Sequence, residues 1–391
     1  MKTYDWIVVG GGITGATLAY ELVKVGLSVL LLEKDTIPDN ATRYSYGGLA
    51  YWSGSTPLTR QLCQEAIARY QVLSSELDAD IELRELDLLL TITADSDPQA
   101  TAALYTHCAT PPRLISVSEA CELEPLLNQD AISGALTVKH GHIHPEKTAQ
   151  AYIQAFLRRG GEMQIAEVVQ IFSGGVKTTT TSYYGANVVV CAGGISRQLL
   201  KNAGISIKIY FTHAEIIATP PVDLQLNTLV MPASLQRFKL ESTSTKDDQL
   251  WDELGNQLLP PILDAGAVQF LDGSFRLGQI SRALTNPHAD IDTQDSENWL
   301  RESITKILPQ LGNLPGTWHH CLVAFSSNSL PLIGAIPGNE NIHIFSGFSN
   351  PLVLVPPLAQ RFAKFIHGQT DEVILQLSRI LSNVKKLGLR S

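Results

Sequence analysis

The N-terminal part of the chain alternates between short apolar runs and glycine-rich turns. Residues 6–9 are apolar without alternation, which is typical of a strand that is buried on both faces. Residues 16–23 carry apolar side chains at helical spacing, Gly26 ends that helix, and residues 28–32 form a second apolar run that leads into Glu33. The pattern predicts a β-turn-α-β unit at the start of the chain.

The rest of the chain contains segments that predict helices and a long part that predicts mainly short strands. Helices are expected at 58–77, 144–159 and 297–308, and a last helix is expected to start at Pro356-Pro357. From residue 207 to about residue 318, short β-rich runs alternate with turns. These alternating short runs predict an antiparallel sheet in a separate domain.

Composition narrows the class of protein. The 391 residues suggest two domains, because one compact domain usually takes ~100–200 residues. The net charge of −9, without a basic run, argues against nucleic acid as a partner. Five cysteines without a Cys-x-x-Cys pair exclude a disulfide framework and fit a reducing cytoplasm. No apolar window reaches the ~18–20 residues of a membrane span, and the N-terminus lacks a signal-peptide pattern, so we expect a cytoplasmic protein.

Gly10, Gly12 and Gly15 form a Gly-x-Gly-x-x-Gly motif between the first strand and the first helix. The first glycine permits a tight turn, the second lets the backbone approach a pyrophosphate, and the third lets the helix lie close to the strand. The helix N-terminus offers free N–H groups to the phosphates. Glu33 lies 18 residues after Gly15, where a carboxylate can bind ribose hydroxyls.

This unit predicts a dinucleotide-binding site. Glycines that serve only a turn are a poorer explanation, because the strands, the helix and the acidic residue are all present. Glu33 would repel the 2′-phosphate of NADP. The chain has no second complete Gly-x-Gly-x-x-Gly, which an enzyme that binds both FAD and NAD(P)H usually needs. A single cofactor that reacts directly with the substrate is therefore expected.

The order of motifs resembles the D-amino acid oxidase/glycine oxidase/sarcosine oxidase family of FAD-dependent oxidoreductases. The resemblance covers most of the chain. It rests on the N-terminal motif that ends in Glu33, the loop 41–48, Glu124-Pro125, His144-Pro145-Glu146, the run Val-Val-Val-Cys-Ala-Gly-Gly at 188–194, Leu-Pro-Leu-Ile-Gly at 330–334 and Ser-Gly-Phe-Ser at 346–349.

The family implies an α/β protein in which a Rossmann-like FAD-binding domain carries an inserted α+β substrate domain built on an antiparallel sheet. On this chain the FAD-binding domain would comprise residues 1–85, 145–207 and 319–391, and the substrate domain residues 86–144 and 208–318. The implied reaction oxidises a C–N bond of a small amine or amino acid by hydride transfer to the flavin N5, and oxygen commonly reoxidises the flavin. The residues expected to contact FAD are Gly10, Gly12, Ile13, Thr14, Gly15, Glu33, Lys34, Ala41, Thr42, Gly47, Gly48, Val168, Ala192, Gly193, Gly334, Gly347, Phe348, Ser349 and Asn350.

Three departures from the family pattern concern the substrate side. Val323 occupies the slot in which members that act on amino acids often hold the carboxylate with an arginine, and valine cannot pair with a carboxylate. Asn328 replaces the usual aspartate of that loop, and Asn-Pro-Leu at 350–352 replaces glycines after Gly347. Glycine or an ordinary D-amino acid is therefore a weaker expectation than for the family as a whole.

Three residues are candidates for catalysis. Arg276 occupies a place that resembles the lysine of sarcosine oxidase, which lies against the flavin and assists oxygen reduction; an exposed strand arginine is an equal alternative. Arg282 is a second candidate anion clamp, with a surface salt bridge as its alternative. His320, like His213 and His319, is a candidate acid or base on the substrate face, with a structural histidine as its alternative.

Cys321 and three alternating histidines leave further alternatives open. Cys321 lies seven residues before Asn328, as the flavin-linked cysteine of sarcosine oxidase lies before its acidic residue, so a thioether to FAD and a buried core cysteine both remain. His140, His142 and His144 would share one strand face, but no second cluster of ligands accompanies them. No metal is therefore expected.

The sequence as a whole predicts an FAD-dependent amine or amino acid oxidoreductase. Its partners would be a small-molecule substrate and oxygen or another electron acceptor. Two alternatives stay open. One is a flavin dehydrogenase that passes electrons to a quinone or carrier protein, and the other is a flavin-binding module without turnover.

Overall fold

The N-terminal unit forms as the apolar pattern predicts. The computed structural model describes residues 2–387. β1 (Thr3–Val9) leads into α1 (Ile13–Lys24) and then β2 (Val29–Glu33). Every residue of β2 is buried, as expected for a strand inside a parallel sheet that is covered on both faces.

Sheet A surrounds this unit with the strand order β17-β18-β10-β1-β2-β7. β18, β10, β1, β2 and β7 run parallel, and β17 closes one edge antiparallel. In such sheets the crevice at the carboxyl ends of the strands is the usual ligand site. The other strands of sheet A are β7 (Glu162–Ile165), β8 (Val168–Phe172), β9 (Gly175–Thr178), β10 (Ser182–Val190), β17 (Leu332–Ile336) and β18 (Asn339–Ser346).

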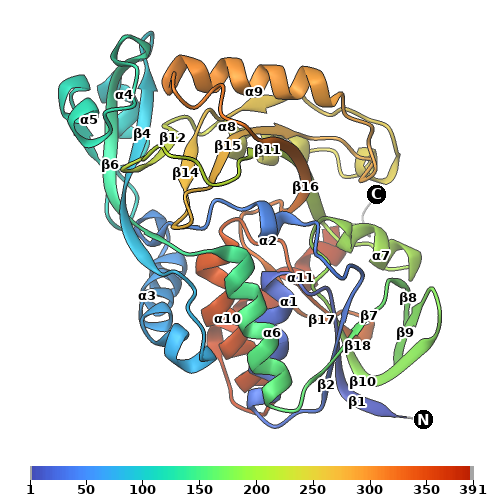
Figure 1. Ribbon diagram of the computed structural model, residues 1–391. Helices are drawn as coiled ribbons and strands as arrows, with labels where there is room; N and C mark the ends of the chain where they lie inside the picture. Colours follow the sequence, from blue (N-terminus) through green and yellow to red (C-terminus); the bar gives the residue numbers. More distant parts are fainter. Residues whose placement is uncertain (1, 388–391) are drawn as a thin grey trace.

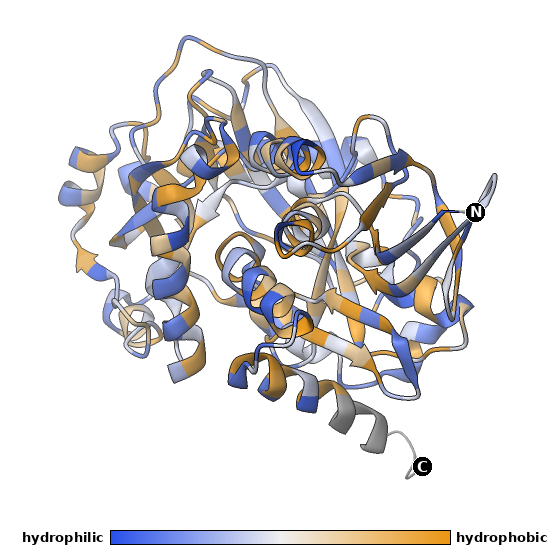
Figure 2. Ribbon diagram, turned by 90° about the horizontal axis from the view of Figure 1, so that it is seen from below, coloured by the Kyte–Doolittle hydropathy of each residue, from blue (hydrophilic) through white to orange (hydrophobic). Residues whose placement is uncertain are grey.

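Helices bury both faces of sheet A (Figure 1). α1 and α10 pack on one face, with α3 and α6 beside them, while α7 and the β8–β9 hairpin cover the other. α11 carries both hydrophobic and hydrophilic residues along its coloured part (Figure 2), and it packs on β17. These helices are α3 (Pro57–Leu77), α6 (Pro145–Arg158), α7 (Ser196–Asn202), α10 (Pro351–Ile366) and α11 (Glu372–Leu387).

Sheet B forms the second domain and confirms the predicted antiparallel sheet. Its strand order is β16-β11-β15-β14-β12-β4-β6-β3, and β12–β4 is a parallel pair. α9 (Thr293–Ile307) lies across one face, where Leu300 and Ile304 are buried (Figure 1). The strands are β3 (Gly48–Leu49), β4 (Arg84–Thr93), β5 (Arg113–Ile115), β6 (Ile132–His142), β11 (Ile209–Ala218), β12 (Leu229–Pro232), β13 (Ile262–Leu263), β14 (Ala267–Gln269), β15 (Phe275–Arg282) and β16 (Thr317–Ser326).

The shorter helices connect these layers. Four of them are α2 (Ala41–Tyr44), α4 (Pro98–Ala103), α5 (Val117–Leu123) and α8 (Gln236–Ser244). No helix within residues 2–387 combines the length and the hydropathy that a membrane crossing needs.

One sequence-based helix boundary differs from the structure. The helix expected to start at Pro356 is α10, which starts at Pro351, and it is not the last helix, because α11 follows it. Pro356 cannot donate to the Leu352 carbonyl, but the Tyr70 hydroxyl donates to that oxygen at 2.6 Å, so the helix continues through the proline. The domain change predicted at residue 319 falls inside β16, which pairs with β11 along its whole length in sheet B.

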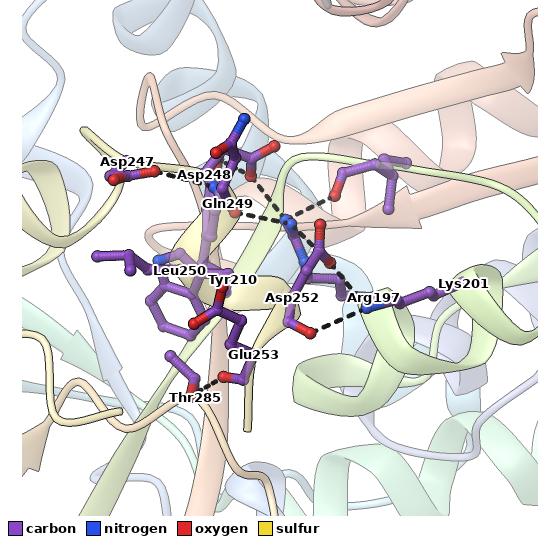
Figure 3. A network of polar contacts seen from close by, with 12 residues as sticks. Arg197, Lys201, Tyr210, Asp247, Asp248, Gln249, Leu250, Asp252, Glu253 and Thr285 are labelled. Carbon is purple, nitrogen blue, oxygen red and sulfur yellow. Dashed lines mark hydrogen bonds and ion pairs between the residues drawn. The ribbon is translucent and has the colours of Figure 1, made fainter. Parts of the chain in front are cut away.

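A polar network fixes the two sheets to each other (Figure 3). Arg197 of α7, which is buried, donates to the Ile207 carbonyl at 3.0 Å and to Asp248 Oδ1 at 2.8 Å. The Tyr210 hydroxyl of β11 donates to the same carboxylate oxygen at 2.9 Å. The loop around Asp248 is thus held on a helix that covers sheet A, and β11 is held with it.

His343 of β18 carries a testable pH dependence. It is buried against Trp6 and Phe362, and within the described residues neither ring nitrogen has a hydrogen-bond partner. Burial lowers the pKa of His343 to about 4. The unfolded chain takes up a proton near the ordinary pKa of ~6.5, so stability is lost as the pH falls from that value toward 4.

We expect His343→Leu to reduce this acid sensitivity. The loss of unfolding free energy between pH 7 and pH 5 should be smaller by roughly 1–2 kcal/mol than in the parent protein. Chemical denaturation at both pH values measures the difference, with the exposed His107→Gln as control. Equal losses in the parent and in His343→Leu would show that this histidine is not the source.

Candidate active site

Two glycines of the first turn are fixed by contacts that leave no room for a side chain. Gly10 has a φ of +107°, which L-residues rarely adopt. A Cβ on Gly15 would lie 1.8 Å from the Gly10 carbonyl oxygen, far inside van der Waals contact. α1 therefore begins directly against the carboxyl end of β1.

The N-terminus of α1 is held next to the loop that contains α2. The N-cap residue Gly12 supplies no side chain, and the Ile13 N–H donates to Thr42 Oγ1 at 2.9 Å. Asn40 caps α2, because its Oδ1 accepts from the N–H groups of Thr42 at 3.0 Å and Arg43 at 3.2 Å. The positive end of the α1 dipole and the Thr42 hydroxyl thus border one place, which suits an anion.

Glu33 lies at the carboxyl end of β2 beside this turn, with its side chain buried. Its Oε2 accepts from the Gly11 N–H at 2.6 Å, and its Oε1 accepts from the N–H groups of Lys34 at 2.9 Å and Asp35 at 3.1 Å. A carboxylate has about four acceptor sites. One site is therefore left for a hydroxyl of a ligand.

The loop after α2 leads from this turn to sheet B. Gly48 pairs with His142 of β6, and a Cβ on Gly47 would lie 2.1 Å from the Ile143 carbonyl oxygen. At the other end, a Cβ on Gly347 would lie 2.7 Å from Ile209 Cδ1 and 3.3 Å from Ser326 Cβ. The glycines at 47, 48 and 347 thus bring the backbone of the first domain against sheet B.

A pocket of about 570 Å³ opens between α2 and the ends of β11, β15 and β16. Arg43 of α2 and Arg276 of β15 both line it, and the ring of His319 is stacked on Tyr44 with centres 4.5 Å apart. Tyr44 also packs with Cys321, which lies on the same face of β16 as His319. The other lining residues are His144, Glu146, Ala218, Thr219, Pro220, Pro221, Asp272, Ser274 and Thr317.

The comparisons with known proteins decide the family. Residues 5–365 match the family described as FAD dependent oxidoreductase. The chain belongs to this family. The predicted resemblance is therefore confirmed, together with the FAD cofactor and the oxidoreductase class.

Individual relatives agree with this placement. A protein of Geobacillus kaustophilus named glycine oxidase is 29% identical over 266 residues, which cover 62% of this chain and 70% of that protein. The solved structure of glycine oxidase from Geobacillus kaustophilus superimposes with a TM-score of 0.76 at 20% identity, over 95% of this chain and 96% of the other. L-proline dehydrogenase from P. horikoshii superimposes with a TM-score of 0.75 at 21% identity, over 98% and 99%. Both structures confirm the predicted fold class.

The first turn and its neighbours fit an adenine dinucleotide. The α1 N-terminus and the Thr42 hydroxyl can hold the pyrophosphate, and Gly12 leaves room for it because it has no side chain. The free acceptor site of Glu33 can hold the ribose. Gly10, Gly15, Ile13 and Thr14 belong to the same turn, and Ala41 to the facing α2. The structure thus brings these predicted residues together around one crevice.

The other predicted FAD contacts lie at varied distances from this turn. Ala192 and Gly193 follow β10 next to Gly10, whereas Val168 lies in the hairpin strand β8 and the Lys34 side chain is exposed. Gly334 makes room for Ser378 of α11, which is a packing reason for its glycine. Phe348 is packed in the core against Phe345, and only Ser349 and Asn350 of that segment are half-buried at the start of α10.

Arg282 and His320 lie on the face of sheet B that points away from the pocket. Arg282 donates to Glu215 Oε1 at 2.6 Å and to Ser296 Oγ of α9 at 3.1 Å. His320 Nε2 lies 2.6 Å from His213 Nδ1. His320 alternates with His319 along β16, and the irregularity where β15 pairs with Glu215 and Ile217 of β11 puts Arg282 on the face opposite to Arg276.

The three alternating histidines bind protein groups. His140 Nδ1 accepts from Trp52 Nε1 at 3.0 Å, His142 Nδ1 accepts from Arg84 Nε at 3.3 Å, and His144 is the N-cap of α6. In the part of the chain that the structure describes, no group of three or more His, Cys, Asp or Glu side chains is placed to hold a metal ion.

Sequence reasoning missed Arg43, it left Tyr44 open between a pocket wall and packing against the first helix, and it gave His319 less weight than His320. A signal was available for His319. Cys321 was a candidate link to the flavin and Val323 occupied the slot of a substrate-binding arginine, and period-two alternation along β16 puts His319 on the same face as both and His320 on the other. Arg43 directly follows the predicted contact Thr42, but a lone arginine in a loop has no pattern that separates it from a surface residue.

Proposed function

We propose that this FAD-dependent oxidoreductase oxidises a C–N bond of a small amine or amino acid. The observation that carries the proposal is the pocket beside the dinucleotide crevice, in which Arg276, Arg43 and His319 converge on a volume that suits a small molecule. The relative named glycine oxidase supports a nitrogen-bearing substrate. When bound, FAD supplies a two-electron acceptor for a hydride from the carbon next to nitrogen.

The residues of the chain would prepare the substrate for this loss of hydride. The amine must be uncharged, since its lone pair assists departure of the hydride, so a group must accept the ammonium proton. Burial lowers the pKa of His319, which is therefore neutral at pH 7 and can take that proton on a ring nitrogen. The stacked Tyr44 ring fixes the imidazole orientation and covers it from water.

His319→Gln tests this role. We expect kcat/KM at pH 7 to fall by roughly 10²-fold, because a positioned base contributes about that much. The loss should shrink as the pH rises and the free amine becomes abundant. The outward-facing His320→Gln should not change the shape of the pH profile. A profile for His319→Gln that parallels the parent at every pH would contradict the assignment.

The electron acceptor is oxygen in our proposal. The structural likeness to a protein named L-proline dehydrogenase favours, as a second candidate, transfer to a quinone or carrier protein. Anaerobic mixing of the FAD-loaded protein with a panel of amines and amino acids, followed by oxygen, separates the two. Bleaching of the flavin band by one substrate class with rapid recovery in oxygen supports an oxidase. Bleaching with negligible recovery supports the dehydrogenase. If no compound bleaches the flavin band, the result supports a flavin-binding module without turnover.

A further inference from the structure

The pocket contains an arginine that forms no ion pair within the described residues, although the carboxylates of Glu146 and Asp272 line the same pocket. Arg276 projects from β15, and its buried Nε has no hydrogen-bond partner within the described residues. Its Nη1 donates to the adjacent Phe275 carbonyl at 3.2 Å, and the guanidinium lies 5.2 Å from the centre of the Phe270 ring. Neither contact neutralises the charge.

Two of the other enclosed arginines bond carboxylates, whereas Arg84 bonds His142 and the Gln269 carbonyl. Arg69 donates to Glu21 at 2.9 Å, and Arg282 to Glu215 at 2.6 Å. A cation that is withdrawn from water without such a partner is costly. Burial accordingly lowers the pKa of Arg276. An anion that enters the pocket would therefore be bound more strongly than one at an exposed arginine.

A second guanidinium faces the same space. Arg43 reaches the pocket from α2, and its Nε lies 3.9 Å from Glu146 Oε1, which is a long contact for an ion pair. Asp272 also lines the pocket, but its Oδ1 accepts from the Ser274 N–H at 2.9 Å and hydroxyl at 2.7 Å. The pocket thus holds two cations, and one of its two carboxylates is already engaged by a neighbour.

This place differs from the slot at Val323. Ala218 pairs with Arg276 on one side and with Thr317 on the other. Val323 lies six residues further along β16, which is roughly 20 Å of strand. The absence of an arginine at position 323 therefore does not leave the site without a guanidinium that could bind an anion. Arg276, on β15 instead of β16, is the cation available for this role.

We propose that the pocket binds an anionic group of the substrate, a carboxylate or a phosphate, with Arg276 as the main anchor and Arg43 as the second. The inference rests on the proposed function in calling the ligand a substrate. A guanidinium fork suits either anion, since both offer paired oxygens. The cavity of about 570 Å³ leaves room for the remainder of a small molecule. An amine that carries an anionic group is therefore preferred to a simple alkylamine.

Titration calorimetry of the FAD-loaded protein with acetate and with inorganic phosphate tests the anchor. Arg276→Gln should weaken binding of the preferred anion roughly tenfold or more, because a charge-assisted hydrogen bond is lost. Arg276→Lys should retain most of the affinity. The exposed Arg113→Gln, on the far strand β5, is the matched control and should bind as the parent does. Tighter binding of acetate indicates that the pocket prefers a carboxylate, and tighter binding of inorganic phosphate indicates that it prefers a phosphate group.

The outcomes separate this inference from the proposed function. Equal anion affinity in the parent and Arg276→Gln, both folded by circular dichroism, would overturn the inference. Slower reoxidation by oxygen in Arg276→Gln, with unchanged anion affinity, would overturn it too and assign the cation to the reduced flavin. Anion binding that depends on Arg276, in a protein that no amine reduces, would support the inference and contradict the proposed amine oxidation.

Discussion

Gly15→Ala is expected to yield a protein that no longer retains FAD. The added Cβ would lie 1.8 Å from the Gly10 carbonyl oxygen, so α1 must move away from β1 by more than 1 Å. The first-turn N–H groups move with the helix, and hydrogen bonds to a pyrophosphate weaken steeply when their geometry is lost. A displacement of this size costs roughly 10²-fold, and we expect FAD affinity to fall by at least that factor.

The measurement is the FAD content of the purified protein and its dissociation constant after reconstitution. Gly174→Ala in the β8–β9 hairpin is the matched control, because its φ of +91° also strains the backbone of an alanine, but the added Cβ would meet no atom within 4 Å. That variant should retain FAD. Parent-like FAD affinity in Gly15→Ala would contradict the assignment of the first turn as the pyrophosphate site.

Arg69→Met is expected to destabilise the fold by about 3–5 kcal/mol, the cost of stranding a buried charge. Arg69 lies on α3 and is 8% exposed, and it donates to Glu21 Oε1 of α1 at 2.9 Å. Arg69 also bonds Glu76, which Lys24 contacts at 2.6 Å. Burial alone would raise the pKa of Glu76, but the hydrogen bonds from Arg69 and Lys24 lower it to about 2.

A double-mutant cycle separates loss of the pair from loss of packing. Arg69→Met leaves Glu21, which is 2% exposed, with Lys24 at 3.4 Å as its ion-pair partner. Adding Glu21→Met removes the stranded carboxylate and should recover much of the stability. Urea unfolding of the four proteins measures the coupling. Additive losses would show that the ion pair itself contributes little.

The parts of the fold that local chemistry specifies could be predicted from the sequence. The apolar run of β2 and the three glycines after β1 determine the first unit, whatever the rest of the chain does. The start of α10 could not be predicted, because it depends on a hydroxyl distant in sequence. Tyr70 satisfies the carbonyl that Pro356 leaves free, and 282 residues separate Tyr70 from Leu352. No local pattern contains that contact.

The candidate site divides in the same way. The turn around Gly12 and Glu33 could be predicted from the sequence, because the spacing of its glycines and of the acidic residue has a direct physical meaning. The pocket could not be predicted, because its residues come from three separate segments. The register of β11 with β15 and β16 brings Arg276 and His319 together, and α2 adds Arg43. Strand parity would have ranked His319 above His320, but the partner of Arg282 is set by α9 and by Glu215.

A crystal structure of the FAD complex tests the account most directly. The account predicts electron density for the pyrophosphate at the N–H groups that follow Gly12, for a ribose hydroxyl on Glu33, and for the ring system between Gly47 and the Cys321 face of sheet B. Density for NAD in that crevice, or side chains that close it against any nucleotide, would contradict it.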